Sequence, residues 1–405
     1  MMKITREFIE KIPKTDLHLH LDGSIRLSTL IELAQENDIP LPFYTEKELK
    51  KEVFKNKYRN LEEYLQGFSY IGAVLQSESA LEKVSYELAI DNIAEGVRYI
   101  EVRFAPQLHQ HKHLGIINVL KAVNRGLNTA AEEFNASVEV QSGKDVRFTY
   151  GIIVCAMRMF DYGYSEYFDA LLDVHKYSER KWIFSLASQE LVKASVEARS
   201  RFKIPIVGFD LAGQEKGYPA VDHKLAYDLA HKNFLKKTVH AGEAFGPESI
   251  FQAITELYAD RIGHGVHLFN TQMIHDHNME IEDKEAYVEN LAQYIGDRRI
   301  TLEVCLTSNL QTVPEFKELK DHSFGKMRDY GLSVTLCTDN RLVSSTTVTD
   351  EIIKAVEAFD ISAKELKNII AYGFKRSFYP GTYLEKRNYV RQVLDTFEAV
   401  ETQFK

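Results

Sequence analysis

The sequence is poor in cysteine, with three among 405 residues. Cys155, Cys305 and Cys337 each lie inside an apolar run, and no two form a C-x-x-C pair. This spacing argues against a disulfide framework and is typical of buried thiols in a reducing compartment. The opening stretch MMKITREFIEK lacks the apolar segment of a signal peptide, and no apolar run is long enough to span a membrane. We therefore expect a cytoplasmic protein.

An excess of positive charge and several common motifs are also absent. The chain carries 50 Lys and Arg against 59 Asp and Glu, a net charge of −9, which does not favour a broad surface for nucleic acid or an anionic membrane. There is no G-x-S-x-G, no Walker loop, no G-x-G-x-x-G after a strand, and no P-C-x-x-C of the cytidine-deaminase type. A small molecule is the expected partner.

What the sequence does contain is a series of short apolar runs separated by helical patterns. The runs are rich in Val, Ile, Leu and Phe, as expected of strands buried on both faces, and alternation with helices favours parallel pairing. Eight such units predict an α/β fold of the (β/α)8 TIM-barrel type, as a single domain over 1–405. The predicted strands are 14–21, 97–106, 147–157, 206–213, 237–243, 261–268, 301–309 and 333–340.

The connection between the first two strands is longer than one crossover helix needs. Its excess, about 44–79, is predicted to form extra helices at the barrel mouth that could act as a lid. Three local signals mark helix ends. Ser28 is predicted to cap the helix after the first strand, Gly96 to end the helix before the second, and Ser362 to open a late helix with a capping box.

Polar residues gather at the carboxyl ends of the runs, where barrel active sites are built. His18 and His20 lie two residues apart in a strand, so both imidazoles face the barrel interior. His240 can face inward from the fifth strand, and Asp339 lies at the tip of the eighth, which neighbours the first in a closed barrel. Three histidines and a carboxylate suit one Zn²⁺ ion, although such a set does not exclude iron or manganese.

Other histidines carry weaker signals. His264 lies between two glycines, which leave it room to approach a metal-bound water. The H-Q-H-K-H stretch of His109, His111 and His113 is spaced like a metal cluster, but it has no nearby carboxylate, and we predict an ordinary loop, with a His109 that lines the barrel mouth as the alternative. His275 and His277 lie in a polar segment and are expected to be solvated.

Eight segments in order resemble the adenosine deaminase family of metal-dependent amidohydrolases. They are PKTDLHLHLDGSI, EVRFAPQLH, IVCAMR, GFDLAGQE, HAGEAFG, RIGHGVHL, LEVCLTSN and CTDN, and together they span nearly the whole chain. The resemblance implies that Glu243 protonates purine N1 and that His264 orients or deprotonates the metal water, with Asp339 assisting. The implied zinc ligands are His18, His20, His240 and Asp339.

The resemblance also assigns His20, Asp22, Gly213 and Asn340 to substrate binding. Gly213 would offer its backbone N–H to purine N3, and Asp22 would contact the ribose hydroxyls. Many family members carry an aspartate where this chain has Asn340, whose partner is purine N7, an acceptor. An asparagine amide always carries donors, whereas a carboxyl must first be protonated, so we predict that Asn340 keeps this contact.

The implied reaction is hydrolysis of adenosine or 2′-deoxyadenosine to the corresponding inosine and ammonia. Glu243 can act as the acid only if it is protonated, and a closed, poorly hydrated pocket would raise its pKa. Other 6-aminopurines remain alternatives: adenine, a modified aminonucleoside, or AMP, for which Lys216 and Arg341 are candidate phosphate ligands. A nucleoside-binding protein without catalysis is a further alternative, against which the intact set of site residues argues.

Overall fold

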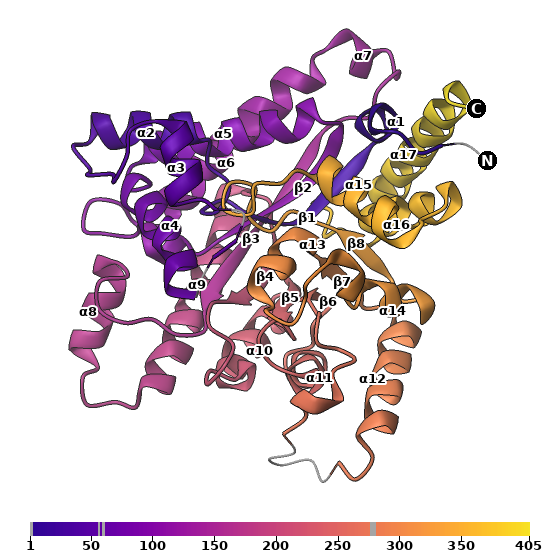
Figure 1. The fold of residues 1–405 in the computed structure, drawn as a ribbon. Coiled ribbons are helices and arrows are strands. Elements are labelled where there is room, and N and C mark those ends of the chain that lie inside the picture. Colours follow the sequence, from indigo (N-terminus) through magenta and orange to yellow (C-terminus); the bar gives the residue numbers. More distant parts are fainter. Residues whose placement is uncertain (1–2, 56, 59–60, 276–280) are drawn as a thin grey trace.

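The computed structural model describes residues 3–55, 57–58, 61–275 and 281–405. Eight parallel strands pair in chain order from β1 to β8, and helices surround them (Figure 1). The predicted (β/α)8 barrel is therefore confirmed. The strands are β1 (Lys14–His20), β2 (Val97–Phe104), β3 (Thr149–Met157), β4 (Ile206–Ala212), β5 (Lys236–Ala241), β6 (Arg261–His264), β7 (Thr301–Val304) and β8 (Val334–Leu336).

The first and last strands close the barrel at the end that carries the polar motifs. Leu19 and Asp339 form a parallel bridge. The Asp339 N–H donates to the His18 carbonyl, and the His20 N–H donates to the Asp339 carbonyl, both over 2.8 Å. These backbone bonds place Asp339 beside the two histidines of β1.

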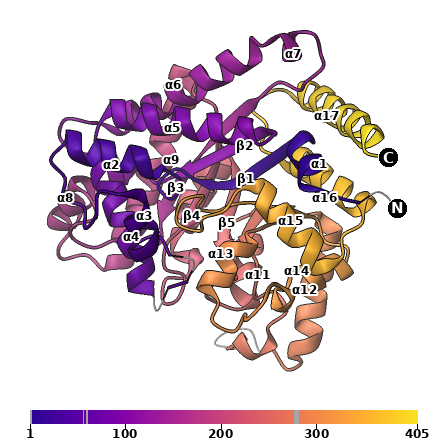
Figure 2. The same ribbon diagram turned by 45° about the horizontal axis from the view of Figure 1, so that its top comes forward.

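Helices fill the connections between the strands. In Figure 2 the last helix lies beside the first, and the rings of Phe8 and Phe397 are 5.7 Å apart. None of the described helices is both long and apolar enough to cross a membrane. The first helices are α1 (Arg6–Lys11), α2 (Leu27–Glu36), α3 (Glu46–Glu52), α4 (Leu61–Val74), α5 (Glu78–Ala94), η1 (Pro106–His109), α6 (Ile116–Asn135), α7 (Val138–Gln141), α8 (Glu166–Val174) and α9 (Arg180–Phe202). The later ones are η2 (Ala220–His223), α10 (Lys224–Lys232), α11 (Pro247–Thr255), η3 (Thr271–Met273), α12 (Lys284–Arg298), α13 (Leu306–Thr312), η4 (Leu319–Asp321), α14 (Phe324–Asp329), α15 (Val348–Phe359), α16 (Ala363–Arg376) and α17 (Tyr383–Gln403).

The connection between β1 and β2 contains the extra helices that the sequence predicts, α3 and α4. The Tyr58 hydroxyl donates to the Val343 carbonyl over 3.1 Å, which ties this segment to the chain that follows β8. The Gln311 amide of α13 donates to the Lys55 carbonyl over 3.5 Å. The extra segment therefore reaches the barrel mouth, while its motion as a lid stays a prediction.

Most predicted strands extend past the observed carboxyl ends. The predicted strand 301–309 ends at Val304, and a helix begins at Leu306. A short buried apolar run suits a strand or a helix equally well, so the sequence pattern alone does not locate this boundary. The consequence is that the polar motifs begin on the last residues of the strands and continue into loops, or into a short helix after β7, at the barrel mouth.

The helix-end signals are partly confirmed. The capping box at Ser362 is present, and Gly96 follows α5 with a left-handed φ of 87°. The prediction for Ser28 is wrong, because α2 begins at Leu27 with Arg26 at its N-cap and without a side-chain cap.

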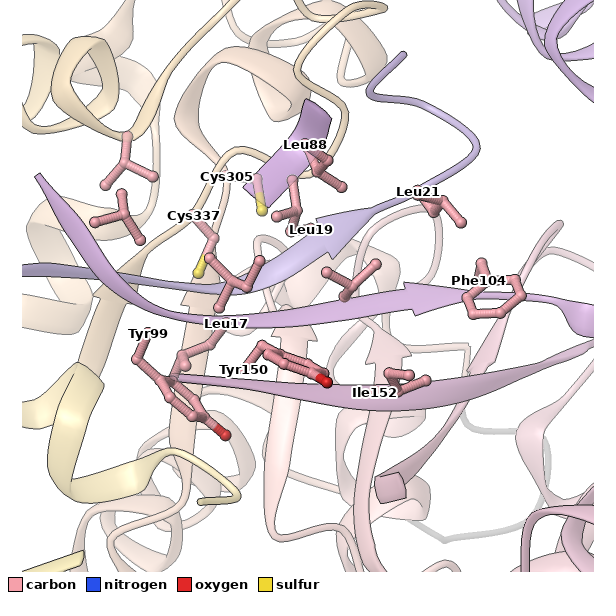
Figure 3. Packing of buried hydrophobic residues seen from close by; sticks show 14 of the residues in the cluster. Leu17, Leu19, Leu21, Leu88, Tyr99, Phe104, Tyr150, Ile152, Cys305 and Cys337 are labelled. Carbon is pink, nitrogen blue, oxygen red and sulfur yellow. The ribbon is translucent and has the colours of Figure 1, made fainter. Parts of the chain in front are cut away.

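The two faces of β1 separate the hydrophobic core from the polar interior. Leu17 and Leu19 are fully buried and belong to the same apolar cluster as Leu88 of α5 (Figure 3). Full burial of each leucine is worth about 1.5–3 kcal/mol. Because side chains alternate along a strand, His18 and His20 face the barrel interior when the leucines pack outward. The three cysteines are free and buried, as predicted.

Candidate metal centre and active site

Four side chains meet at the carboxyl end of the barrel, and one ligand atom of each lies within 4.8 Å of the others. His20 Nε2 and His240 Nε2 are 3.1 Å apart. Asp339 Oδ1 lies 3.4 Å from the Nε2 atoms of His18 and His20. The structure thus brings together the four residues that the sequence singles out as ligands.

The chemistry of this cluster fits a metal ion. His18 Nε2 is buried and makes no hydrogen bond with any described residue. A buried polar atom without a partner costs free energy unless a ligand or ion satisfies it. Imidazole nitrogens and a carboxylate oxygen are ligands that suit divalent transition metals. The cluster is therefore a candidate metal site.

Two buried carboxylates orient the ligand histidines. Glu303 Oε2 lies 2.9 Å from His18 Nδ1, and Asp210 Oδ2 lies 3.0 Å from His240 Nδ1. Each carboxylate accepts the Nδ1 proton, so the Nε2 lone pair of each histidine is left for a metal. Neither carboxylate is among the site residues predicted from the sequence.

Arg103 of β2 joins these two carboxylates inside the barrel. Its guanidinium donates to Asp210 and to Glu303, each over 2.8 Å, and Arg261 donates to Glu303 over 2.6 Å. Burial raises the pKa of Asp210 and Glu303, but the adjacent positive charges outweigh it, and both pKa values lie well below the usual range. The sequence feature that could have indicated this network is the presence of charged residues, such as Arg103 and Glu303, inside otherwise apolar strand runs.

The protonation of the ligand histidines differs. Burial lowers the pKa of His18, and it lowers that of His240 to about 3, so both are neutral as metal ligands must be. Burial also opposes the charged form of His20, but Asp22 and Asp339 outweigh it and raise its pKa. A proton therefore competes with a metal mainly at His20.

His264 is fixed by a directed chain of hydrogen bonds. The backbone N–H of Phe324 donates to His322 Nδ1 over 2.9 Å, so neutral His322 carries its proton on Nε2. That proton faces Asn309 Oδ1 at 3.1 Å, and the Asn309 amide nitrogen lies 3.0 Å from His264 Nδ1. Since the amide donates there, neutral His264 carries its proton on Nε2 and directs it into the site.

Glu243 lies directly opposite this proton. Its Oε2 is 3.7 Å from His264 Nε2. Burial raises the pKa of Glu243, and the negative charges of Asp339 and Glu215 add to the rise; only a protonated His264 would counteract it in part. A carboxyl with a raised pKa is suited to act as an acid near neutral pH.

The predicted substrate-binding residues line the same end of the barrel. Asp22 Oδ1 lies 3.6 Å from His20 Nδ1. Gly213 follows β4 with a φ of 97°, a conformation that favours glycine. Asn340 is buried against Gly23, where an added Cβ would come within 1.8 Å of its amide oxygen.

The histidines of the H-Q-H-K-H stretch have separate partners. His109 is buried, and its Nδ1 lies 2.9 Å from the Leu75 carbonyl. His111 Nε2 lies 3.1 Å from the Gln76 carbonyl. Because a carbonyl only accepts, His109 carries its proton on Nδ1, and its buried Nε2 is an acceptor without a partner among the described residues.

The two histidines of the polar segment after β6 are placed only in part. The backbone N–H of His275 donates to the Glu248 carboxylate over 3.0 Å, and His277 lies outside the described residues.

Comparison with known proteins agrees with this geometry. The adenosine deaminase family model matches residues 13–396. The chain belongs to the adenosine deaminase family. Adenosine deaminase 1 of Streptomyces coelicolor is 34% identical over 377 residues, which cover 92% of this chain and 84% of that protein. The chain is accordingly an enzyme of this deaminase family.

Solved structures of the same fold include enzymes with different substrates. A zinc-bound amidohydrolase of Burkholderia ambifaria aligns with a TM-score of 0.76 at 18% identity, covering 100% of this chain and 96% of that one. The N6-methyl-AMP deaminase of Arabidopsis thaliana aligns with a TM-score of 0.72 at 23% identity, covering 96% and 98%. At these identities the likeness establishes the fold, and the substrate must be argued from the site.

Proposed function

We propose that this enzyme is a zinc-dependent aminohydrolase that converts adenosine or 2′-deoxyadenosine to inosine or 2′-deoxyinosine and ammonia. The main support is the pairing of Glu243 and His264, 3.7 Å apart, beside four metal-ligand side chains. Addition of water to a purine needs an activated water and an acid for the ring nitrogen. We also propose a cytoplasmic location, in keeping with the three buried free thiols.

Each catalytic residue has a separate task in this proposal. A zinc ion held by the cluster would supply a water whose pKa is lowered to about 7. His264, whose Nδ1 is occupied by Asn309, would direct its Nε2 proton at the oxygen of this water and so orient it. Glu243 donates its proton to purine N1, which makes C6 more open to attack. Asp339, held by Ser308 over 2.5 Å, would accept one proton of this water and pass it to the departing ammonia, while Glu243 would regain its proton from the new C6 hydroxyl.

The purine edge is read by two groups from the loops that follow β4 and β8. Gly213 offers its backbone N–H to purine N3, since a residue without a side chain lets the ring approach closely. Asn340 offers an amide N–H to N7, which is always an acceptor.

The sugar end of the site favours a nucleoside over a nucleotide. Asp22 Oδ1 and His109 Nε2 are buried atoms without hydrogen-bond partners among the described residues. Asp22 lies close enough for its charge to act on the pKa of His109, although burial keeps that pKa low. Two acceptors suit the hydroxyl donors of ribose, whereas a phosphate brings negative charge and acceptors only. Arg341, a candidate phosphate ligand, is already paired with Glu95.

The experiment that tests the function is a substrate panel with purified, zinc-loaded protein. Ammonia release is followed from adenosine, 2′-deoxyadenosine, adenine, N6-methyl-AMP and AMP. We expect kcat/KM for the two nucleosides to exceed that for the free base and the nucleotides by at least about 10²-fold, the size of a lost set of polar contacts. Preference for a nucleotide would refute the nucleoside assignment, and no turnover of any aminopurine would refute the deaminase proposal.

A further inference from the structure

Glu215 lies in the loop after β4 and is buried, with 7% of its surface exposed. Its carboxylate accepts hydrogen bonds from four consecutive backbone N–H groups of the loop after β5. The donors and distances are Gly242 (2.9 Å), Glu243 (3.1 Å), Ala244 (2.7 Å) and Phe245 (3.0 Å). The hydroxyl of Ser249, in the first turn of α11, donates to the same carboxylate.

This arrangement differs from an ordinary buried ion pair. Within the described residues, no salt bridge includes Glu215, so uncharged N–H and O–H donors stabilise its carboxylate. Successive backbone N–H groups form such concave anion sites where the chain can adopt a left-handed turn. Gly242 supplies that turn with a φ of 69°. A side chain of the protein thus occupies a cradle made by the loop that carries Glu243.

We infer that Glu215 is the positioning residue that fixes Glu243 against His264 and the substrate. This inference rests on the proposed function, because Glu243 is the proposed acid. Glu215 holds the backbone N–H of Glu243 itself and those of both neighbours, so the backbone position of Glu243 depends on this carboxylate. Removal of the carboxylate leaves four backbone donors without their acceptor in a partly buried site, which favours a rearranged loop.

The contacts of Glu215 determine what its loss should change. Glu215 touches the loop and not the cluster of four ligands, so zinc binding should persist without it. A misplacement of a catalytic group by about 1 Å costs about 10²-fold in rate. The negative charge of Glu215 also contributes to the raised pKa of Glu243. Loss of this charge should lower that pKa, so that less Glu243 is protonated and the rate falls further.

The test compares Glu215→Gln with the matched control Ser249→Ala. A glutamine keeps one acceptor oxygen and turns an NH₂ group towards backbone donors, so the loop loses part of its cradle. Ser249→Ala removes one donor from the same carboxylate but leaves its four backbone contacts in place. We expect kcat on adenosine to fall about 10²-fold for Glu215→Gln with KM changed less than about fivefold, and to stay within about twofold for Ser249→Ala. Zinc content should match the unmodified protein in both.

Hydrogen–deuterium exchange gives a second result that is independent of activity. The amides of residues 242–245 should exchange faster in Glu215→Gln and at the original rate in Ser249→Ala. If Glu215→Gln does not fold, Glu215→Asp, which keeps both oxygens on a shorter side chain, takes its place with a smaller expected loss. Unchanged exchange in a folded variant, or equal losses of kcat in variant and control, would overturn the inference. If the unmodified protein shows no deaminase activity, the proposed function is refuted. The role of Glu215 in holding the loop would still be decided by hydrogen–deuterium exchange at residues 242–245.

Discussion

At the scale of single residues, the site contains backbone strain that function explains better than packing does. His264 and Asp339 adopt left-handed φ values of 63° and 61°. Such a conformation costs a non-glycine residue on the order of 1–3 kcal/mol, and it persists only where the surroundings enforce it. Here the barrel closure holds Asp339, and the hydrogen bond from Asn309 holds His264. Both side chains consequently point into the metal site.

The role of Glu243 as an acid can be separated from any role in metal binding. Glu243→Gln keeps the shape of the side chain but has no acidic proton to give to purine N1. We expect kcat to fall at least about 10²-fold, the usual contribution of a positioned acid. Metal analysis of the purified variant should still give one zinc per chain, and loss of zinc would contradict the assignment.

The proposed contact between Asn340 and purine N7 can be tested with a substrate analogue that lacks N7. Asn340→Ala should weaken binding of adenosine by about 1 kcal/mol, close to fivefold in Kd, because one hydrogen bond to N7 is lost. A 7-deaza analogue has no N7 acceptor and should lose much less. Equal losses for the two ligands, measured by calorimetry, would show that Asn340 does not contact N7.

At the scale of elements, several strands of the barrel supply the candidate metal ligands and the residues that orient them. β1 carries His18 and His20, and β5 carries His240, while the supporting carboxylates come from β4 and β7. Arg103 of β2 crosses the barrel interior to reach both carboxylates. The strand register therefore determines the metal site as much as the ligands do.

Replacement of Arg103 should affect stability and metal affinity together. Arg103→Met leaves Asp210 and Glu303 buried with less compensating charge, and breaking such a network costs about 3–5 kcal/mol. We expect a loss of that size in the free energy of unfolding, and a fall in zinc affinity of about 10–100-fold from misoriented histidines.

The control for this experiment is an arginine on the surface. Arg125 of α6 pairs with Glu78 and Glu82 at about two-fifths exposure of its side chain. Arg125→Met should change the free energy of unfolding by less than about 1 kcal/mol. Urea unfolding and competition with a zinc indicator measure both variants, and similar effects of the two changes would contradict the role of the Arg103 network.

At the scale of the whole molecule, a bound metal should join distant parts of the chain, since its ligands span residues 18 to 339. A ligand that binds only the folded state stabilises it by about 2.7 kcal/mol at a hundred times Kd. Single-domain folding over 1–405 stays a prediction, and cooperative thermal unfolding is the measurement that bears on it.

The stabilisation by zinc should depend on pH through His20. Its raised pKa means that protonation stabilises the metal-free fold below the unfolded pKa, and that this contribution is lost as pH rises through the folded pKa. Zinc binds the neutral imidazole, so its affinity rises over the same range. We expect the difference in Tm between zinc-loaded and chelator-treated protein to be larger at pH 8 than at pH 6. An equal or reversed difference would contradict this.

The sequence by itself determined the architecture and the four residues of the candidate metal cluster. Two histidines at a spacing of two share one face of a strand, and polar residues at strand ends meet at one end of a barrel. The helices α3 and α4, the capping box at Ser362 and the buried cysteines follow from equally local rules.

Only the tertiary structure decided which distant groups support the site. Glu303 orients His18, Asn309 sets the tautomer of His264, and Glu215 cradles the loop of Glu243. The two members of each pair come from different strands, loops or helices, so their contact depends on strand register, on loop conformation and on where α13 begins. A local pattern in the sequence carries none of these, because side-chain contacts across a barrel are fixed by the packing of the whole chain.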